Sequence, residues 1–148
     1  MPNIKKIKIA VAIDKPERLS PLSEVFGRSN FFLIYDLLED SEDVLTNPFA
    51  KELGGAGIQS ARYLIENNVD VLIVKKIGTN PFRFLTSADI EVYQCQGTNA
   101  TEAIRLFTEG KLSLIENMRG DIVSGRMRKR QGRYFTDIKF MNSKKGKI

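Results

Sequence analysis

The sequence predicts an α/β protein, built on a mixed five-stranded sheet with helices covering both of its faces. The first observation is the order of the patterns, in which a strand and a hairpin are followed by alternating helical and strand segments. The second is composition, because 148 residues that are 42% hydrophobic and 28% charged are typical of one soluble domain with a real core.

The N-terminal part of the chain reads as a strand followed by a β-hairpin. Residues 7–13 are mostly apolar and predict a central strand. Residues 15–30 contain two prolines, several serines and a glycine, and they predict a loop with at most one helical turn. Residues 31–36 predict a second strand, residues 39–43 an acidic turn, and residues 44–46 a third strand that closes the hairpin.

A cluster of three glycines, Gly54, Gly55 and Gly57, opens the next segment. An apolar-striped helix over 56–67 follows it and leads into a strand over 69–74. Glycines allow positive φ and a close approach of the backbone to a ligand, and a helix N-terminus adds partial positive charge. The cluster therefore predicts an anion-binding site, with a tight helix entry as the alternative.

Two more helices and one strand complete the predicted domain. Residues 79–89 predict a helix that is capped by Thr79 or Asn80. Residues 91–95 predict the last strand, and Asn99 then opens a third helix with a glutamate at capping-box spacing. Right-handed crossovers predict the strand order 3-2-1-4-5, with the second strand antiparallel to the first.

This topology gathers several features at one edge of the sheet, where the three parallel strands end; we call this edge the rim. Ligands of open α/β sheets bind at such an edge, and three helices begin there with their N–H groups facing the same way. Lys75 or Lys76 could add positive charge. The predicted ligand-binding residues of the rim are Arg28, Gly54, Gly55, Gly57, Gly78, Thr79, Asn80, Gly97 and Thr98. Arg28 could instead pair with a structural carboxylate, either Glu24 or Asp36.

The composition excludes many catalytic and metal sites. The chain has no histidine and one cysteine, so histidine-based catalysis, histidine zinc sites and thiolate-ligated clusters in a lone chain are ruled out. Cys95 is the single soft metal ligand, and a buried thiol is the alternative interpretation of it. Asp14, Glu24 and Asp36 imitate a nuclease carboxylate cluster, but the first strand contains no acid, which argues against a nuclease.

Charge divides the chain into two parts. Residues 1–116, the predicted folded domain, hold 13 Lys and Arg against 16 Asp and Glu, giving −3. Residues 117–148, a predicted basic C-terminal tail, hold 10 Lys and Arg against 2 Asp and Glu, which gives a net charge of +8. The residues of the tail that suit phosphate contacts and base stacking are Arg126, Arg128, Lys129, Arg130, Arg133 and Tyr134. A solvated extension, or one that docks on the acidic body of a neighbouring chain, is the alternative.

The composition also predicts the cellular compartment of the protein. The chain has no apolar run long enough to cross a bilayer and no basic-then-apolar leader. A single cysteine suits a reducing compartment. We therefore expect a cytoplasmic protein with no membrane partner.

Several segments in a characteristic order resemble the dinitrogenase iron–molybdenum cofactor biosynthesis family over roughly residues 7–116. The matching segments are Ile9–Ala12, Ser20–Arg28, Phe31–Asp36, Asn47–Pro48, Gly54–Gln59, Val69–Ile73, Gly78–Phe82, Gly97–Thr98 and Glu102–Ala103. The resemblance implies an RNase H-like three-layer fold and a role in binding or ferrying an iron–sulfur-type cluster with partner proteins. Where this chain has Val25, the family often has a histidine that could ligate a cluster.

Three functional hypotheses follow. The first is a non-catalytic binding or carrier domain that holds an anionic metal-cluster-type ligand at the rim through backbone N–H groups and Arg28. The second is a nucleic-acid-binding accessory protein that uses the basic tail, with the body as a homo-oligomeric platform. The third is a small enzyme that acts on a phosphorylated substrate at the rim.

Overall fold

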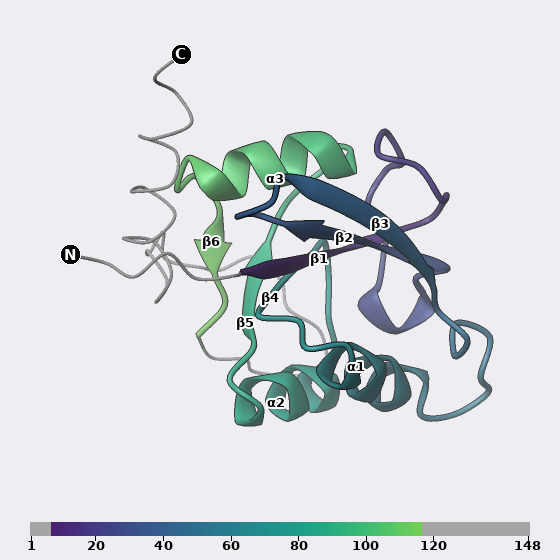
Figure 1. Cartoon of the computed structure of the whole chain (residues 1–148). Helices are drawn as coiled ribbons and strands as arrows, with labels where there is room; N and C mark the ends of the chain where they lie inside the picture. The colour runs from purple at the N-terminus through teal and green to yellow at the C-terminus, as the bar shows by residue number, and fades with distance from the viewer. Residues whose placement is uncertain (1–6, 117–148) are drawn as a thin grey trace, which may run out of the picture.

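The computed structural model describes residues 7–116; residues 1–6 and the predicted tail, 117–148, lie outside the described part. The described residues form an α/β fold around a mixed six-stranded sheet with the order β3-β2-β1-β4-β5-β6. Helices α1 and α2 cover one face of this sheet, and α3 covers the other (Figure 1). In the described part of the chain, none of the helices has the length and apolar character that a bilayer crossing requires.

The elements follow one another as the sequence patterns predict, with small shifts at their ends. In chain order they are β1 (Lys8–Ile13), the 3-10 helix η1 (Phe26–Arg28), β2 (Phe31–Asp36), β3 (Ser41–Thr46), α1 (Ala56–Glu66), β4 (Val71–Val74), α2 (Thr79–Ser87), β5 (Glu91–Gln94), α3 (Ala100–Thr108) and β6 (Ser113–Leu114).

The strand order confirms the prediction for the first five strands and adds a sixth. Strand β6 pairs antiparallel with β5, so two strands, β2 and β6, run against β1 rather than the single one predicted. A strand of two residues is too short to show a period of two in the sequence, which is why β6 was not predicted. The RNase H-like classification stays a prediction.

Two local predictions were wrong. The predicted acidic turn over 39–43 is shorter, because Glu42 and Asp43 already belong to β3. These side chains are exposed and β3 is an edge strand, where charge is tolerated and hinders pairing with other chains. In α2, the N-cap is Gly78 rather than Thr79 or Asn80, and it makes no side-chain capping bond.

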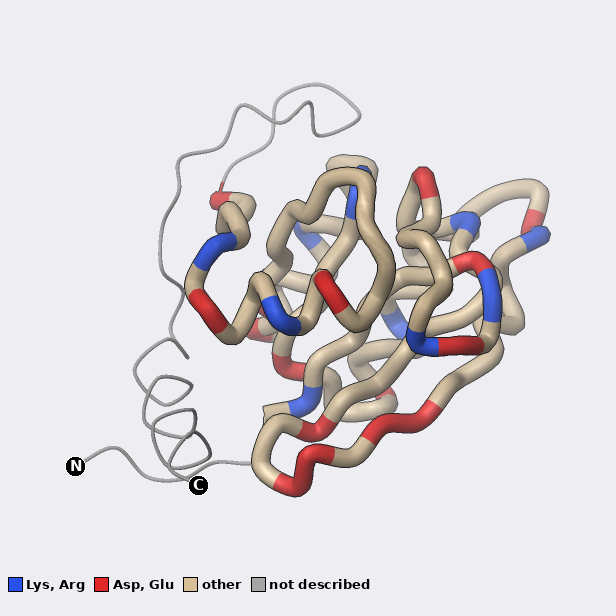
Figure 2. The backbone as a smooth tube through the Cα atoms, turned by 90° about the horizontal axis from the view of Figure 1, so that it is seen from above, with Lys and Arg blue, Asp and Glu red and all other residues tan. Residues whose placement is uncertain are grey.

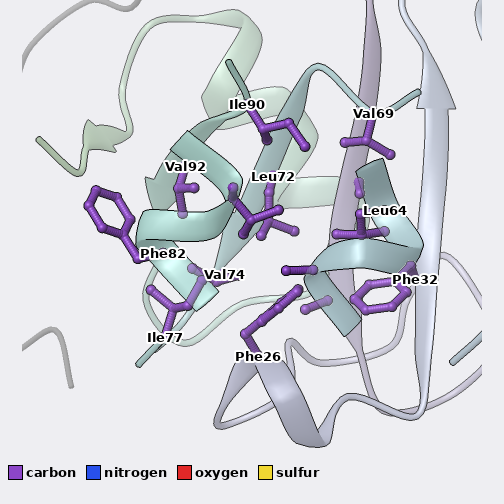
Figure 3. Close-up of a cluster of buried hydrophobic side chains, with 14 of the residues drawn as sticks. Phe26, Phe32, Leu64, Val69, Leu72, Val74, Ile77, Phe82, Ile90 and Val92 are labelled. Atoms are coloured by element: carbon purple, nitrogen blue, oxygen red, sulfur yellow. The ribbon is translucent and has the colours of Figure 1, made fainter. Parts of the chain in front are cut away.

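The core consists of two apolar clusters, one on each face of the sheet. Strands β1 and β4 run through the middle and are buried almost throughout, which explains their continuous apolar sequences. Figure 3 shows the cluster on the α1 and α2 face, where Phe26 of η1 lies among side chains from the sheet and from both helices. The rings of Phe26 and Phe32 have their centroids 5.8 Å apart. The loop after β1 is therefore anchored in the core.

Candidate functional site

The loop between β1 and β2, residues 14–30, is the element that connects the parts of the rim. The amide of Leu22 donates to the Thr98 carbonyl at 3.2 Å, and the amide of Phe26 donates to the Lys76 carbonyl at 2.9 Å. Gly27 packs against Gly57 at the start of α1. This loop and the loop before α1 lie on the same side of the molecule (Figure 1). The predicted convergence at one edge of the sheet is confirmed for these segments.

Two buried serines hold the start of this loop. The Ser20 hydroxyl accepts hydrogen bonds from the amides of Asp14 and Lys15, at 3.1 and 2.9 Å. The Ser23 hydroxyl donates to the Asp14 carboxylate at 2.8 Å. Asp14 therefore stabilises the turn that follows β1. In the β1–β2 ladder Asp36 lies opposite Lys8, at the other end of β1 from Asp14, so the carboxylates of a nuclease-like cluster do not converge.

The three glycines of the cluster have different surroundings. Gly55 is the N-cap of α1 and has φ 77°, a conformation that glycine adopts without strain. A Cβ on Gly57 would lie 2.9 Å from Cγ of Pro81, and a Cβ on Gly27 would lie 2.8 Å from the backbone nitrogen of Gly57. Gly57 therefore allows α1, α2 and η1 to pack closely, whereas Gly54 and Gly55 face open space.

The expectation that three helix starts offer their amides was wrong for α3. The amide of Ala100 donates to the Ser20 carbonyl and that of Thr101 to the Arg18 carbonyl, both at 3.0 Å. The amide of Glu102 donates to the Asn99 side chain at 2.8 Å, as the capping-box spacing predicts. The first turn of α3 thus stabilises the loop after β1, and these three amides are not available to bind an anion.

Arg28 interacts with backbone carbonyls rather than with a carboxylate. Its Nη1 atom donates to the carbonyls of Ala50 and Glu52, at 3.2 and 2.6 Å. The predicted alternative, a pair with Glu24 or Asp36, is wrong because Glu24 pairs with Lys75 and Asp36 accepts from the amides in the β2–β3 turn. Arg28 thus supports the loop that precedes the glycine cluster.

A pocket of about 210 Å³ opens at the rim, between the loop after β1 and the segment that precedes α3. The residues that line it are Leu19, Pro21, Leu22, Lys75, Gly97, Thr98 and Asn99. Gly97 and Thr98 are predicted site residues, and Lys75 was one of two lysines expected to add charge. The other predicted residues lie in η1 and at or just before the starts of α1 and α2, and they do not line this pocket. Its apolar wall was not predicted, because nothing in the sequence of the loop shows which of its residues face a cavity.

Lys75 places a cation at the wall of the pocket. It follows the last residue of β4, and its side chain is 28% exposed. Its Nζ atom lies 2.9 Å from the Glu24 carboxylate, and this contact holds the pKa of Glu24 below its usual value. A run of acidic residues lies along the β2–β3 hairpin (Figure 2). Lys75 is the one positively charged side chain among the residues that line the pocket.

Cys95 does not fit a metal ligand. It follows β5, is only 2% exposed, and belongs to the apolar cluster on the α3 face. Burial, together with the charge of Glu102, raises the pKa of its thiol to about 11, so the thiol is protonated at neutral pH. Within residues 7–116, histidine, cysteine, aspartate and glutamate form no group of three that could hold a metal ion. The predicted nucleic-acid contacts, Arg126 to Tyr134, lie outside the described residues.

The burial of Cys95 leads to a prediction about its reactivity. At pH 8 iodoacetamide should modify Cys95 at least about tenfold more slowly in the folded protein than in urea-unfolded protein, because the reactive thiolate is scarce and buried. Mass spectrometry of timed samples measures both rates. Equal rates in the two states would show that the thiol is accessible and that a ligand role must be reconsidered.

Comparisons with known proteins give the chain a family. The model of the family described as dinitrogenase iron-molybdenum cofactor matches residues 5–110. An uncharacterised protein of Methanocaldococcus jannaschii is 34% identical over 117 residues, which cover 76% of this chain and 95% of that protein.

Solved structures agree with this assignment. The apo form of the orange protein from Desulfovibrio gigas aligns with a TM-score of 0.71 at 25% identity, covering 76% of this chain and 96% of that one. A Thermotoga protein described as a candidate NifB protein aligns with a TM-score of 0.67 at 29% identity, covering 77% and 99%. The chain belongs to the dinitrogenase iron-molybdenum cofactor family.

Proposed function

We propose that this protein is a non-catalytic binding or carrier domain that holds an anionic, metal-cluster-type ligand at the rim. The observation that carries the proposal is the pocket between the loop after β1 and residues 97–99, with the Lys75 ammonium at its wall. Membership of a cofactor family supports an accessory role, in which the ligand is cargo received from one partner protein and passed to another.

The residues that line the pocket suit an anion with a soft, weakly hydrated surface. Lys75 supplies positive charge, and Thr98 supplies a hydroxyl that can donate a hydrogen bond. Leu19, Pro21 and Leu22 form an apolar wall that a weakly hydrated anion can contact. A ligand larger than the pocket would extend toward the remaining predicted residues of the rim. Those residues are Arg28, Gly54, Gly55, Gly57, Gly78, Thr79 and Asn80.

The donor set does not fit direct ligation of iron by this chain. The chain has no histidine, and its one cysteine is buried and protonated. A metal cluster would therefore have to arrive with its own ligands and be held by charge and hydrogen bonds. We also infer that the protein is not an enzyme, which membership of a cofactor family supports.

The test is equilibrium binding of tetrathiomolybdate, a coloured metal–sulfur dianion, under anaerobic conditions and followed by its visible absorbance. The wild-type protein should bind it, and Lys75→Met should weaken binding about tenfold by removing the cation at the pocket wall. Lys111→Met is the matched control, because Lys111 is also ion-paired but lies beyond the C-terminal end of α3. No binding by the wild type, or equal losses in both variants, would overturn the proposal.

A further inference from the structure

We propose that Glu24 is a built-in competitor for the Lys75 ammonium, so that an anionic ligand gains the full charge of Lys75 only by displacing the Glu24 carboxylate. The inference rests on the proposed function and concerns how the same pocket is regulated. It assigns to Glu24, which does not line the pocket, the role of setting how tightly the pocket binds.

The two partners of this ion pair are held to different degrees. Lys75 directly follows the buried strand β4, and its carbonyl accepts a hydrogen bond from the buried Gln94 side chain at 3.3 Å. The next carbonyl, of Lys76, accepts from the amide of Phe26 at 2.9 Å. Lys75 therefore starts from a fixed backbone position. Glu24 lies in a loop, and its side chain is 60% exposed, so it is the partner that can turn away into water.

The energetics favour exchange. An exposed ion pair contributes little to stability, because water screens the charges and two side chains must be held in place. A dianion in the pocket would meet the same ammonium with twice the charge of a carboxylate. The Glu24 carboxylate, like an ordinary glutamate, is negatively charged at neutral pH, so it also repels such a ligand directly. Glu24 therefore opposes binding in two ways.

The test is Glu24→Gln, which keeps the size of the side chain and removes its charge. This variant should bind tetrathiomolybdate about three- to tenfold more tightly than the wild type, because Lys75 is released and a repelling charge is removed. Glu109→Gln is the matched control: Glu109 is also a carboxylate in ion pairs, with Arg105 and Lys111, but it follows the C-terminal end of α3. The Glu109→Gln variant should bind tetrathiomolybdate with the same affinity as the wild type.

A double-mutant cycle separates competition for Lys75 from simple repulsion. In the Lys75→Met background, Glu24→Gln should give a clearly smaller gain than in the wild type. An equal gain in both backgrounds would overturn the inference, because Glu24 would then act on the ligand alone.

The outcomes distinguish this inference from the proposed function. If the wild type binds and Glu24→Gln binds no more tightly, the competitor role fails and the proposed function stands. If neither protein binds, both fail. Tighter binding by Glu24→Gln than by the wild type, with a gain that depends on Lys75, would support the competitor role.

Discussion

Phe26→Ala is expected to lower the free energy of unfolding by about 3–5 kcal/mol. The side chain of Phe26 is 1% exposed and packs against Phe32, so its removal leaves a cavity in the core on the α1 and α2 face (Figure 3). Phe26 also anchors the loop whose residues Pro21 and Leu22 line the pocket. The variant should therefore weaken ligand binding as well as the fold.

Urea denaturation followed by circular dichroism measures the free energy of unfolding of Phe26→Ala and of the wild type. Leu53→Ala is the control, because Leu53 is fully exposed and its truncation should change the free energy of unfolding by less than about 0.5 kcal/mol. A loss of less than about 1 kcal/mol for Phe26→Ala would show that the loop is not held by this side chain.

Gly27→Ala is expected to lower the free energy of unfolding by about 1–3 kcal/mol, because the added methyl group overpacks the contact between η1 and α1. An added Cβ would lie 2.8 Å from both Cα and N of Gly57. These are backbone atoms near the start of α1, so they cannot move away as the end of a flexible side chain could. The helix and η1 would have to separate, which opens the core beside Phe26.

Gly54→Ala provides a control of the same chemistry in the same region. A Cβ on Gly54 has no atom within 4 Å and the residue does not need positive φ. The substitution should change the free energy of unfolding by no more than about 1 kcal/mol, in the stabilising direction, because alanine has fewer unfolded conformations. Thermal and urea unfolding compare the two variants. Equal effects would mean that the contact between Gly27 and Gly57 is unimportant.

Two predictions about the rim were confirmed, one from a local pattern and one from the order of the strands. The capping spacing of Asn99 gave the start of α3 correctly, and parallel strands implied that the loop after β1 and the start of α2 share an edge. The prediction failed for the amides of α3 because their partners, the carbonyls of Arg18 and Ser20, are distant in the chain. Helix N-termini predict where donors are, but not whether another segment already uses them.

Arg28 and Lys75 show that the partners of charged side chains are likewise hard to predict from sequence. Arg28 was predicted as one of the ligand-binding residues of the rim, and in the structure its side chain donates to two carbonyls of the loop before α1. Lys75, given only as a possibility, lines the pocket. Long side chains reach several positions, so their partners depend on how the loops fold back over the sheet.

The sequence by itself determined the α/β class, the order of the first five strands, the starts of α1 and α3, and the resemblance to the family. These depend on periodicity, glycine placement and capping, which act over a few residues. Only the tertiary structure decided that Gly57 serves packing, that Glu24 pairs with Lys75, and that the pocket lies beside Thr98. The physical reason is that these contacts join segments far apart in the chain, and packing of the loop after β1 brings them together.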